Sequence, residues 1–201
     1  MKSPPATHLV VHLRDEASAR ELHHRLKERL QECKLELHPT KTKIVYCKDE
    51  DRTGNYSHTS FKFLGFEFRP RGAKNKHGKI FCNFLPAASP SALKEMRKTV
   101  WAWRLKWCSE KSLEDLSRMF NPIIRGWVQY YGKYYKSALF PVSEQINLHL
   151  AKWVANKYKT FRRKPRRAMH ALGKTARKKP ILFAHWSVLG TLPAIGARRA
   201  V

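Results

Sequence analysis

The chain has 201 residues, of which 41 are Lys or Arg and 15 are Asp or Glu, so its formal net charge is +26. Hydrophobic residues make up 42% of the chain and aromatic residues 11%, which excludes general disorder and predicts one full domain or two small ones. Because so large a positive excess repels itself in a compact fold, we expect a polyanionic partner. Nucleic acid is the default, and a membrane surface is the competitor.

Membrane insertion and disulfide bonding are not expected. No stretch approaches the roughly 20 consecutive apolar residues that cross a bilayer, and the apolar run of MKSPPATHLVV is too short for a secretory signal. The four cysteines are scattered without the spacing of a zinc site or a disulfide framework: Cys33, Cys47, Cys82 and Cys108. These features predict a cytoplasmic protein.

The first part of the chain combines short apolar runs with one amphipathic helix. Residues 8–13 (HLVVHL) predict a buried strand, and a helix is expected over residues 16–33, where leucines recur at every fourth position. Short strands are predicted at residues 35–37 and 44–46. Between them lies a proline-containing turn with Lys41 and Lys43. The order strand, helix, strand is typical of a compact α/β layer.

Two aromatic runs follow a polar loop. Residues 61–68 (FKFLGFEF) and 79–84 (KIFCNF) predict a β-hairpin. The segment between them, RPRGAKNKHG, forms a basic tip with four cations: Arg69, Arg71, Lys74 and Lys76. Such a tip is either solvated or a phosphate-binding finger, and the sequence leaves both interpretations open.

From Ser89 onward the apolar spacing is that of helices. Ser89 is an N-cap candidate followed by Pro90 at the first helical position, and a second helix is predicted to begin near Ser112. The first helix is expected to form an apolar seam of Leu93, Met96, Val100, Trp103 and Trp107. The pair Asn121-Pro122 is expected to kink or restart the second helix. A third helix is announced by Pro141 and Ser143, with Ile146, Leu150, Trp153, Val154, Tyr158 and Phe161 on one face. Three such helices predict a bundle.

Residues 120–140 (FNPIIRGWVQYYGKYYKSALF) interleave aromatic and cationic side chains. Such a stretch is either an aromatic core face with a basic rim or a surface that stacks on bases and grips phosphates. Helical spacing assigns one set of residues to the core: Ile123, Ile124, Trp127 and Tyr131. The cations Arg125, Lys133 and Lys136 fall largely elsewhere and are the expected RNA-facing set, together with Gln129.

Residues 157–179 form the densest positive segment. It includes Arg162, Arg163, Lys164, Arg166 and Arg167, and it offers little apolar content, so we expect it to gain little from burial. A solvated tail is one interpretation, and phosphate contact with RNA or DNA, which would relieve the self-repulsion, is the other. The apolar residues 181–186 (ILFAHW) are predicted to dock back on the bundle.

The sequence predicts no independent catalytic or metal site. Acid–base and metal chemistry need convergent carboxylates, histidines or cysteines. The cluster Asp49-Glu50-Asp51 lies in a loop between Lys48 and Arg52, and His23 and His24 point in different directions on a helix. No phosphate-binding glycine loop and no nucleophile elbow is present. We therefore expect no catalytic residues, no metal ligands and no cofactor.

Several ordered motifs together resemble the reverse transcriptase/maturases encoded by group II introns. Residues 33–47 (CKLELHPTKTKIVYC) are similar to the palm segment after the catalytic strand, and FKFLGFEF is similar to the strand that leads to the thumb. RGWVQYYGKYY (residues 125–135) resembles the maturase-specific thumb, also called domain X. LFAHW (residues 182–186) resembles the C-terminal end of bacterial members that lack an endonuclease domain.

This resemblance implies an α+β fold, in which a partial reverse-transcriptase palm (strand-helix-strand plus β-hairpin) precedes an α-helical thumb bundle. The implied division is a partial palm and hairpin over residues 1–88, the thumb over residues 89–165 and a basic C-terminal extension over residues 166–201. Lys41 and Lys43 match the palm turn near the incoming nucleotide in that family, and here they are expected to be phosphate contacts at most.

The chain departs from the family at the catalytic motif. The resemblance places Thr7 and His8 where the family has the two aspartates that hold Mg²⁺, and neither side chain can replace a carboxylate pair. We therefore expect an RNA-binding maturase-type protein that assists group II intron folding and splicing as a truncated reverse transcriptase, with structured intron RNA as its partner. Mg²⁺ is expected only for the intact enzyme or the RNA. The alternative is the C-terminal piece of a split RNA-directed DNA polymerase that works with a separately encoded N-terminal half. A degraded remnant without a selected role is a third reading.

Overall fold

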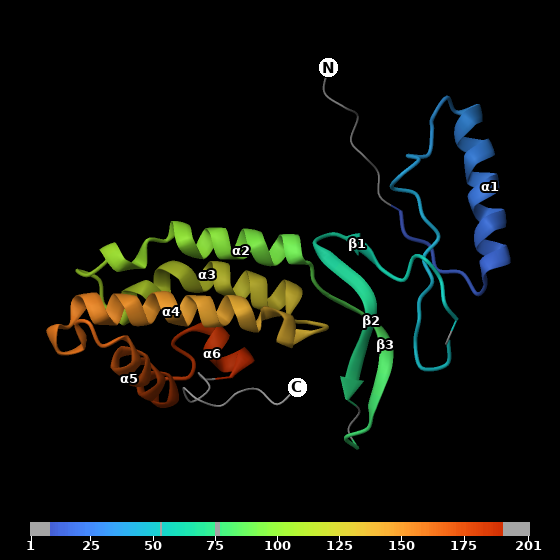
Figure 1. Cartoon of the computed structure of the whole chain (residues 1–201). Coiled ribbons are helices and arrows are strands. Elements are labelled where there is room, and N and C mark those ends of the chain that lie inside the picture. The colour runs from blue at the N-terminus through green and yellow to red at the C-terminus, as the bar shows by residue number, and fades with distance from the viewer. Residues whose placement is uncertain (1–8, 53, 75–76, 191–201) are drawn as a thin grey trace.

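The computed structural model describes residues 9–52, 54–74 and 77–190. Expectations that concern Thr7, His8 and Lys76 lie outside these residues. Over the described residues the protein is α+β, as predicted, with six α-helices and one three-stranded antiparallel sheet. Figure 1 shows the sheet in the middle, with one isolated helix on one side and the packed helices on the other.

The isolated helix is α1 (Glu16–Glu32), which confirms the helix predicted over residues 16–33. Its N-cap is Asp15, whose carboxylate accepts a hydrogen bond from the backbone N–H of Ser18 at 2.8 Å. Ion pairs between neighbouring turns, such as Glu16 with Arg20, line its surface. No residue of α1 is buried, so its leucines are not covered by a core.

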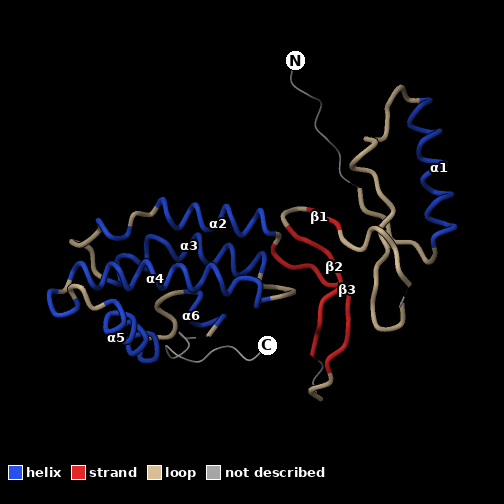
Figure 2. Tube along the Cα trace, in the orientation of Figure 1, coloured by secondary structure: helices blue, strands red, loops and turns tan. Residues whose placement is uncertain are grey.

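The three short strands predicted beside α1 are wrong. Over residues 9–13, 35–37 and 44–46 the described backbone is irregular, and Figure 2 draws the whole stretch between α1 and the first strand as loop. A strand exists only where a second strand satisfies its backbone groups, and these segments do not pair with one another. Leu9, Leu13 and Leu35 are accordingly exposed.

The predicted hairpin is confirmed in part, within a three-stranded sheet. The run of residues 61–68, predicted as one strand, turns at Leu64-Gly65 and contributes to two antiparallel strands. The strands β1 (Phe61–Phe63), β2 (Phe66–Lys74) and β3 (Ile80–Ala88) lie in the order β1-β2-β3, and the β2–β3 register runs from Phe66 opposite Ala88 to Lys74 opposite Ile80. Strand β2 is longer than predicted, because its pairing with β3 continues through residues expected in the tip. Arg69 and Arg71 therefore belong to the strand.

Both predicted helix starts are confirmed. Helix α2 (Pro90–Ala102) has Ser89 as its N-cap, and the Ser89 hydroxyl accepts a hydrogen bond from the Ala92 N–H at 3.2 Å. Helix α3 (Leu113–Tyr131) begins with a capping box between Ser112 and Asp115. The seam expected along α2 ends earlier than predicted: Trp107 lies in a short 3₁₀ turn, η1 (Leu105–Trp107), and is exposed.

Helix α3 is continuous through Asn121-Pro122, so the predicted restart is wrong. Asn121 is buried and uses its side chain to bind a segment sixty residues away. Its Nδ2 donates to the Leu182 carbonyl at 2.8 Å, and its Oδ1 accepts from the Ala184 N–H at 3.0 Å. Asn121 therefore fastens the end of the described chain to the middle of α3.

The remaining helices complete the bundle: α4 (Phe140–Lys157), α5 (Pro165–Lys178) and α6 (Ala184–Leu189), with 3₁₀ turns η2 (Lys136–Leu139) and η3 (Lys159–Phe161). The docking predicted for residues 181–186 is confirmed, because Phe183 and Trp186 are buried in the core. Ile181 is the exception and is exposed. None of the helices described is long and apolar enough to cross a membrane.

One hydrophobic core joins α2 to α6, and it corrects two predictions. Ile146, Leu150 and Trp153 of α4 are buried as predicted, whereas Tyr158 is exposed and Phe161 is half-buried. On α3, Ile124 is buried but Ile123 is 40% exposed.

The basic segment gains more from burial than expected. Ala168, Leu172 and Ala176 recur at every fourth position of α5 and are all buried. Helix α5 packs on α4 through this narrow stripe of mostly small residues.

Candidate nucleic-acid interface

The basic face of α5 lines a hollow in the surface. Arg166, Arg167, His170 and Lys174 border it together with Ala171 and the half-buried ring of Phe161. Because Ala168, Leu172 and Ala176 face α4, the charged residues of α5 are left on the exposed side of the helix. Arg166, His170 and Lys174 recur at every fourth position and therefore share one face. A concave, cationic surface with one aromatic side chain results.

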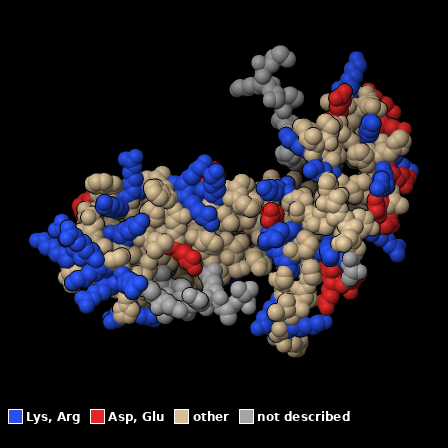
Figure 3. Space-filling model, viewed as in Figure 1, with Lys and Arg blue, Asp and Glu red and all other residues tan. Residues whose placement is uncertain are grey.

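Three further cations precede α5. Arg162, Arg163 and Lys164 are exposed immediately before its first residue, and the first turn of α5 contains no acidic side chain. The partial positive charge of the helix N-terminus is therefore uncompensated locally and adds to that of the side chains. The ion pairs found among the described residues include none of the predicted contacts at 162–164, 166 and 167. Figure 3 shows Lys and Arg gathered at the end of the bundle that carries α5.

The aromatic residues at the C-terminal end of α3 connect the helices to the sheet. Phe66 of β2 lies 5.1 Å from Tyr130 and 5.2 Å from Tyr131 between ring centroids. The hydroxyl of Tyr130 donates to the Leu64 carbonyl at 3.0 Å, and burial raises the pKa of Tyr131. These rings are therefore structural. Arg125, Lys133 and Lys136 are exposed, and the Lys133 ammonium lies 5.7 Å from the centre of the Tyr134 ring.

Arg71 is committed to contacts within the protein. Its side chain is only 10% exposed. Its guanidinium donates to the Leu85 carbonyl at 3.3 Å and to a carboxylate oxygen of Glu67 at 3.3 Å, and it lies 5.4 Å from the centre of the Tyr135 ring. Burial lowers its pKa, and the charge of Arg69 acts in the same direction. Arg71 thus links the sheet to the start of η2 instead of presenting a free cation.

The structure does not bring the other predicted contacts to this site. Lys41 and Lys43 are exposed in the loop after α1, which lies on the opposite side of the sheet from α5 (Figure 1). Lys74 is exposed at the end of β2. The sequence reasoning also missed His170 and Phe161 as parts of the hollow. The signal for His170 was its position four residues after Arg166 and four before Lys174, on the face of α5 opposite Ala168 and Leu172.

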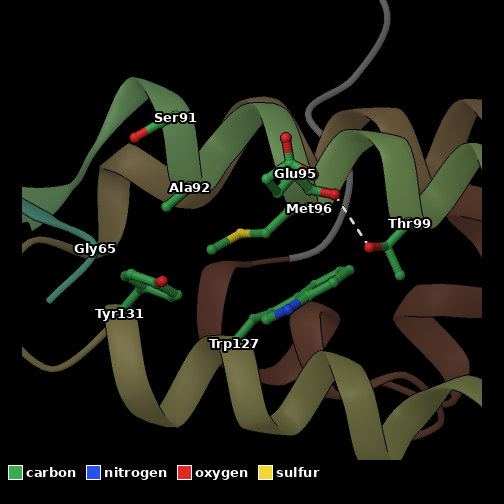
Figure 4. Close-up of a pocket in the computed structure, with 8 residues that line it drawn as sticks. All are labelled: Gly65, Ser91, Ala92, Glu95, Met96, Thr99, Trp127 and Tyr131. Carbon is green, nitrogen blue, oxygen red and sulfur yellow. Dashed lines mark hydrogen bonds between the residues drawn. The ribbon is translucent and has the colours of Figure 1, made fainter. Parts of the chain in front are cut away.

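A second hollow lies between α2 and α3 and has a different character. Figure 4 shows the rings of Trp127 and Tyr131 on α3 opposite Met96 on α2, with Glu95 and Thr99 along one edge. The Thr99 hydroxyl donates to the Glu95 backbone carbonyl at 3.0 Å. Its lining contains no cation and one carboxylate, so this hollow does not suit a phosphate.

Over residues 9–52, 54–74 and 77–190, no three His, Cys, Asp or Glu side chains lie close enough together to hold a metal ion. The surface of α5 is instead a cationic one that suits a polyanion. Such a surface fits phosphates because each contact displaces a condensed counterion.

Comparison with known proteins identifies the helical part of the chain. Residues 93–172 match the family model of the group II intron, maturase-specific domain, which is about two fifths of the chain. The match begins in α2 and ends in α5, so it covers most of the bundle and reaches the basic hollow. No curated protein and no solved structure matches the chain. This domain indicates a maturase function in group II intron splicing and implies interaction with intron RNA. The resemblance seen in RGWVQYYGKYY is thus confirmed, and residues 93–172 belong to the maturase-specific domain family of group II introns.

Proposed function

We propose that this protein binds structured group II intron RNA through the basic surface of α5 and assists the folding of that RNA, while the RNA itself performs splicing. The observation that carries the proposal is the hollow bordered by Arg166, Arg167, His170 and Lys174, at the C-terminal end of the region that matches the maturase-specific domain. Helix α5 then acts with the thumb of residues 89–165 as one binding unit, since it packs on α4.

The charge of this surface predicts strongly salt-dependent binding. Neutralising one phosphate contributes roughly −0.7 to −0.9 to the slope of log K against log salt concentration. Arg162, Arg163, Lys164, Arg166 and Arg167 together therefore predict a slope of about −4. Double-stranded RNA suits a surface of this kind, because it is recognised mainly by its shape and its phosphates.

Filter binding with a folded group II intron RNA tests the assignment. Arg166→Ala with Arg167→Ala should weaken binding and reduce the salt slope by about 2. The matched control removes the same charge elsewhere: Lys41→Ala with Lys43→Ala should change affinity much less. Equal losses in the two double variants, or binding that does not depend on salt, would refute the assignment to α5.

The aromatic-basic stretch has its own test. Lys133→Ala with Lys136→Ala removes two exposed cations, of which Lys133 lies beside the Tyr134 ring, and we expect weaker RNA binding with almost unchanged stability. Normal RNA binding by this double variant would make the stretch a scaffold only.

We further propose that the chain does not synthesise DNA by itself, because the resemblance places Thr7 and His8 at the metal-binding aspartates of the family. The second candidate function is that of a C-terminal piece of a split reverse transcriptase, favoured by the exposed leucines of residues 9–35. Primer extension on an RNA template should show no synthesis by this chain. Synthesis by the chain alone would refute the proposed loss of catalysis.

A further inference from the structure

Two tryptophans stand out on the surface of the bundle. Trp101 is 68% exposed and Trp107 is 73% exposed, whereas Trp153 and Trp186 are buried. An indole is the largest apolar side chain, and leaving two of them in water forgoes a substantial burial free energy. Exposed aromatic side chains of this size are characteristic of binding surfaces.

The chain around these tryptophans is fixed to α4. Trp101, near the end of α2, meets the His149 ring of α4 edge-to-face, with 5.8 Å between the ring centroids. The turn η1, which carries Trp107, is anchored by the buried Leu105 and by Asn156 of α4, whose Nδ2 donates to the Lys106 carbonyl at 2.9 Å. The exposure of Trp107 is therefore not a consequence of a loose loop.

The two α4 residues that hold these segments, His149 and Asn156, are spaced to suit a short run of nucleotides. His149 and Asn156 are seven residues apart on α4, which corresponds to roughly 10 Å along the helix axis. Stacked bases rise about 3.4 Å per step, so roughly three steps span this distance.

Cations accompany both tryptophans. The Lys106 ammonium lies 5.5 Å from the centre of the Trp107 ring. Lys152 is close enough to His149 to lower the pKa of that histidine, after the larger effect of burial. Both lysines are exposed. An aromatic surface with cations beside the rings matches the pattern that binds single-stranded nucleic acid, whose bases stack while its phosphates are neutralised. A partner protein with an apolar surface fits less well, because it would leave the ammonium groups of Lys106 and Lys152 without a counter-charge.

We propose that Trp101 and Trp107 form a stacking site for unpaired bases of single-stranded RNA, separate from the phosphate-binding surface of α5. This inference rests on the proposed RNA-binding function and adds the class of RNA segment that this second surface takes. Trp101 and Trp107 stack on bases, and Lys106 and Lys152 contact the adjacent phosphates.

The test is a fluorescence titration of the full chain with two oligomers of equal length. One is an unstructured oligouridylate, and the other has the same phosphate backbone with abasic sites. The oligouridylate should quench the exposed tryptophans and bind more tightly than the abasic oligomer. Trp101→Ala with Trp107→Ala should abolish that difference, with a loss of affinity of about 5- to 150-fold for each lost stack. Trp107→Phe should retain part of the affinity, because the ring still stacks.

Matched variants separate this inference from the proposed function. Arg166→Ala with Arg167→Ala should leave the preference for the oligouridylate over the abasic oligomer unchanged, since it removes phosphate contacts only. Equal binding of the two oligomers by the unaltered chain, or an unchanged preference in the folded double tryptophan variant, would overturn the stacking site. Retained binding of folded intron RNA in that case would leave the proposed function standing. Failure of the unaltered chain to bind folded intron RNA would instead remove the proposed function.

Discussion

Asn147 is the residue whose replacement tests the packing of the bundle most directly. It is buried on α4, and its Oδ1 accepts a hydrogen bond from Trp186 Nε1 at 2.8 Å and lies 2.9 Å from His185 Nε2. An indole nitrogen can only donate, which fixes this Asn147 atom as the oxygen. His185 therefore carries its proton on Nε2, and its buried Nδ1 is left without a hydrogen-bond partner.

Asn147→Leu keeps a side chain of similar size and removes the shared acceptor. Two buried N–H donors, one on Trp186 and one on His185, then lose their partner. Each unsatisfied buried donor costs about 1–3 kcal/mol, so the free energy of unfolding should fall by about 2–6 kcal/mol. Against a total of about 5–15 kcal/mol for a typical domain, this is a large share.

Urea unfolding followed by circular dichroism measures the effect. The midpoint should fall while the slope m stays constant, because the surface exposed on unfolding is unchanged. Asn156→Leu on the same helix is the control, since Asn156 is exposed and water can replace it as the hydrogen-bond partner of the Lys106 carbonyl. We expect a loss of about 1 kcal/mol or less there. A similar small loss for Asn147→Leu would refute the assigned role of this acceptor.

Three further predictions concern His185, Gly65 and Trp127. Burial lowers the pKa of His185 from 6.5 to about 3, so the unfolded chain takes up a proton first as pH falls. The stability that the neutral His185 gives is complete above pH 6.5 and is lost progressively between pH 6.5 and about 3. At pH 5 the free energy of unfolding should be lower by about 2 kcal/mol. Urea unfolding at pH 7 and pH 5 should show that loss, and His185→Phe should remove it. Gly65→Ala should destabilise the protein by about 1 kcal/mol or more in thermal unfolding, because φ is +80° and the added Cβ would lie 2.6 Å from the Tyr131 hydroxyl. Trp127→Ala should lower the free energy of unfolding by an amount at the lower end of ~3–5 kcal/mol, since this half-buried indole stacks on Trp103. A loss below about 1 kcal/mol would show that Trp127 is not part of the core.

Local signals were sufficient to predict the elements whose physics is local. The cap residues Ser89 and Ser112 satisfy N–H groups three positions away, so the starts of α2 and α3 follow from a few adjacent letters. The hairpin of β2 and β3 is encoded in the same way, by two β-prone runs joined by a short segment. Net charge is likewise a property of composition, and it pointed to a polyanion before any fold was known.

The candidate site could be predicted only in part. The cations of residues 162–167 were visible as a charge run, but the hollow requires α5 to turn its alanine stripe toward α4. Arg71 has the same appearance in the sequence as Arg166, yet the fold surrounds it with Glu67, Leu85 and Tyr135. Whether a cation is free or committed depends on neighbours that the sequence does not place.

The sequence by itself determined the caps, the helical spacing, the hairpin and the family motif, because each depends on residues close together in the chain. The tertiary structure decided what Asn121 and Asn147 do, since their partners lie about sixty and forty positions away. It also decided that residues 9–13 form no strand, because a strand needs a paired neighbour and a helix does not. Long-range contacts thus converted an expected helix breaker, Asn121-Pro122, into the point that fastens residues 182–184 to the bundle.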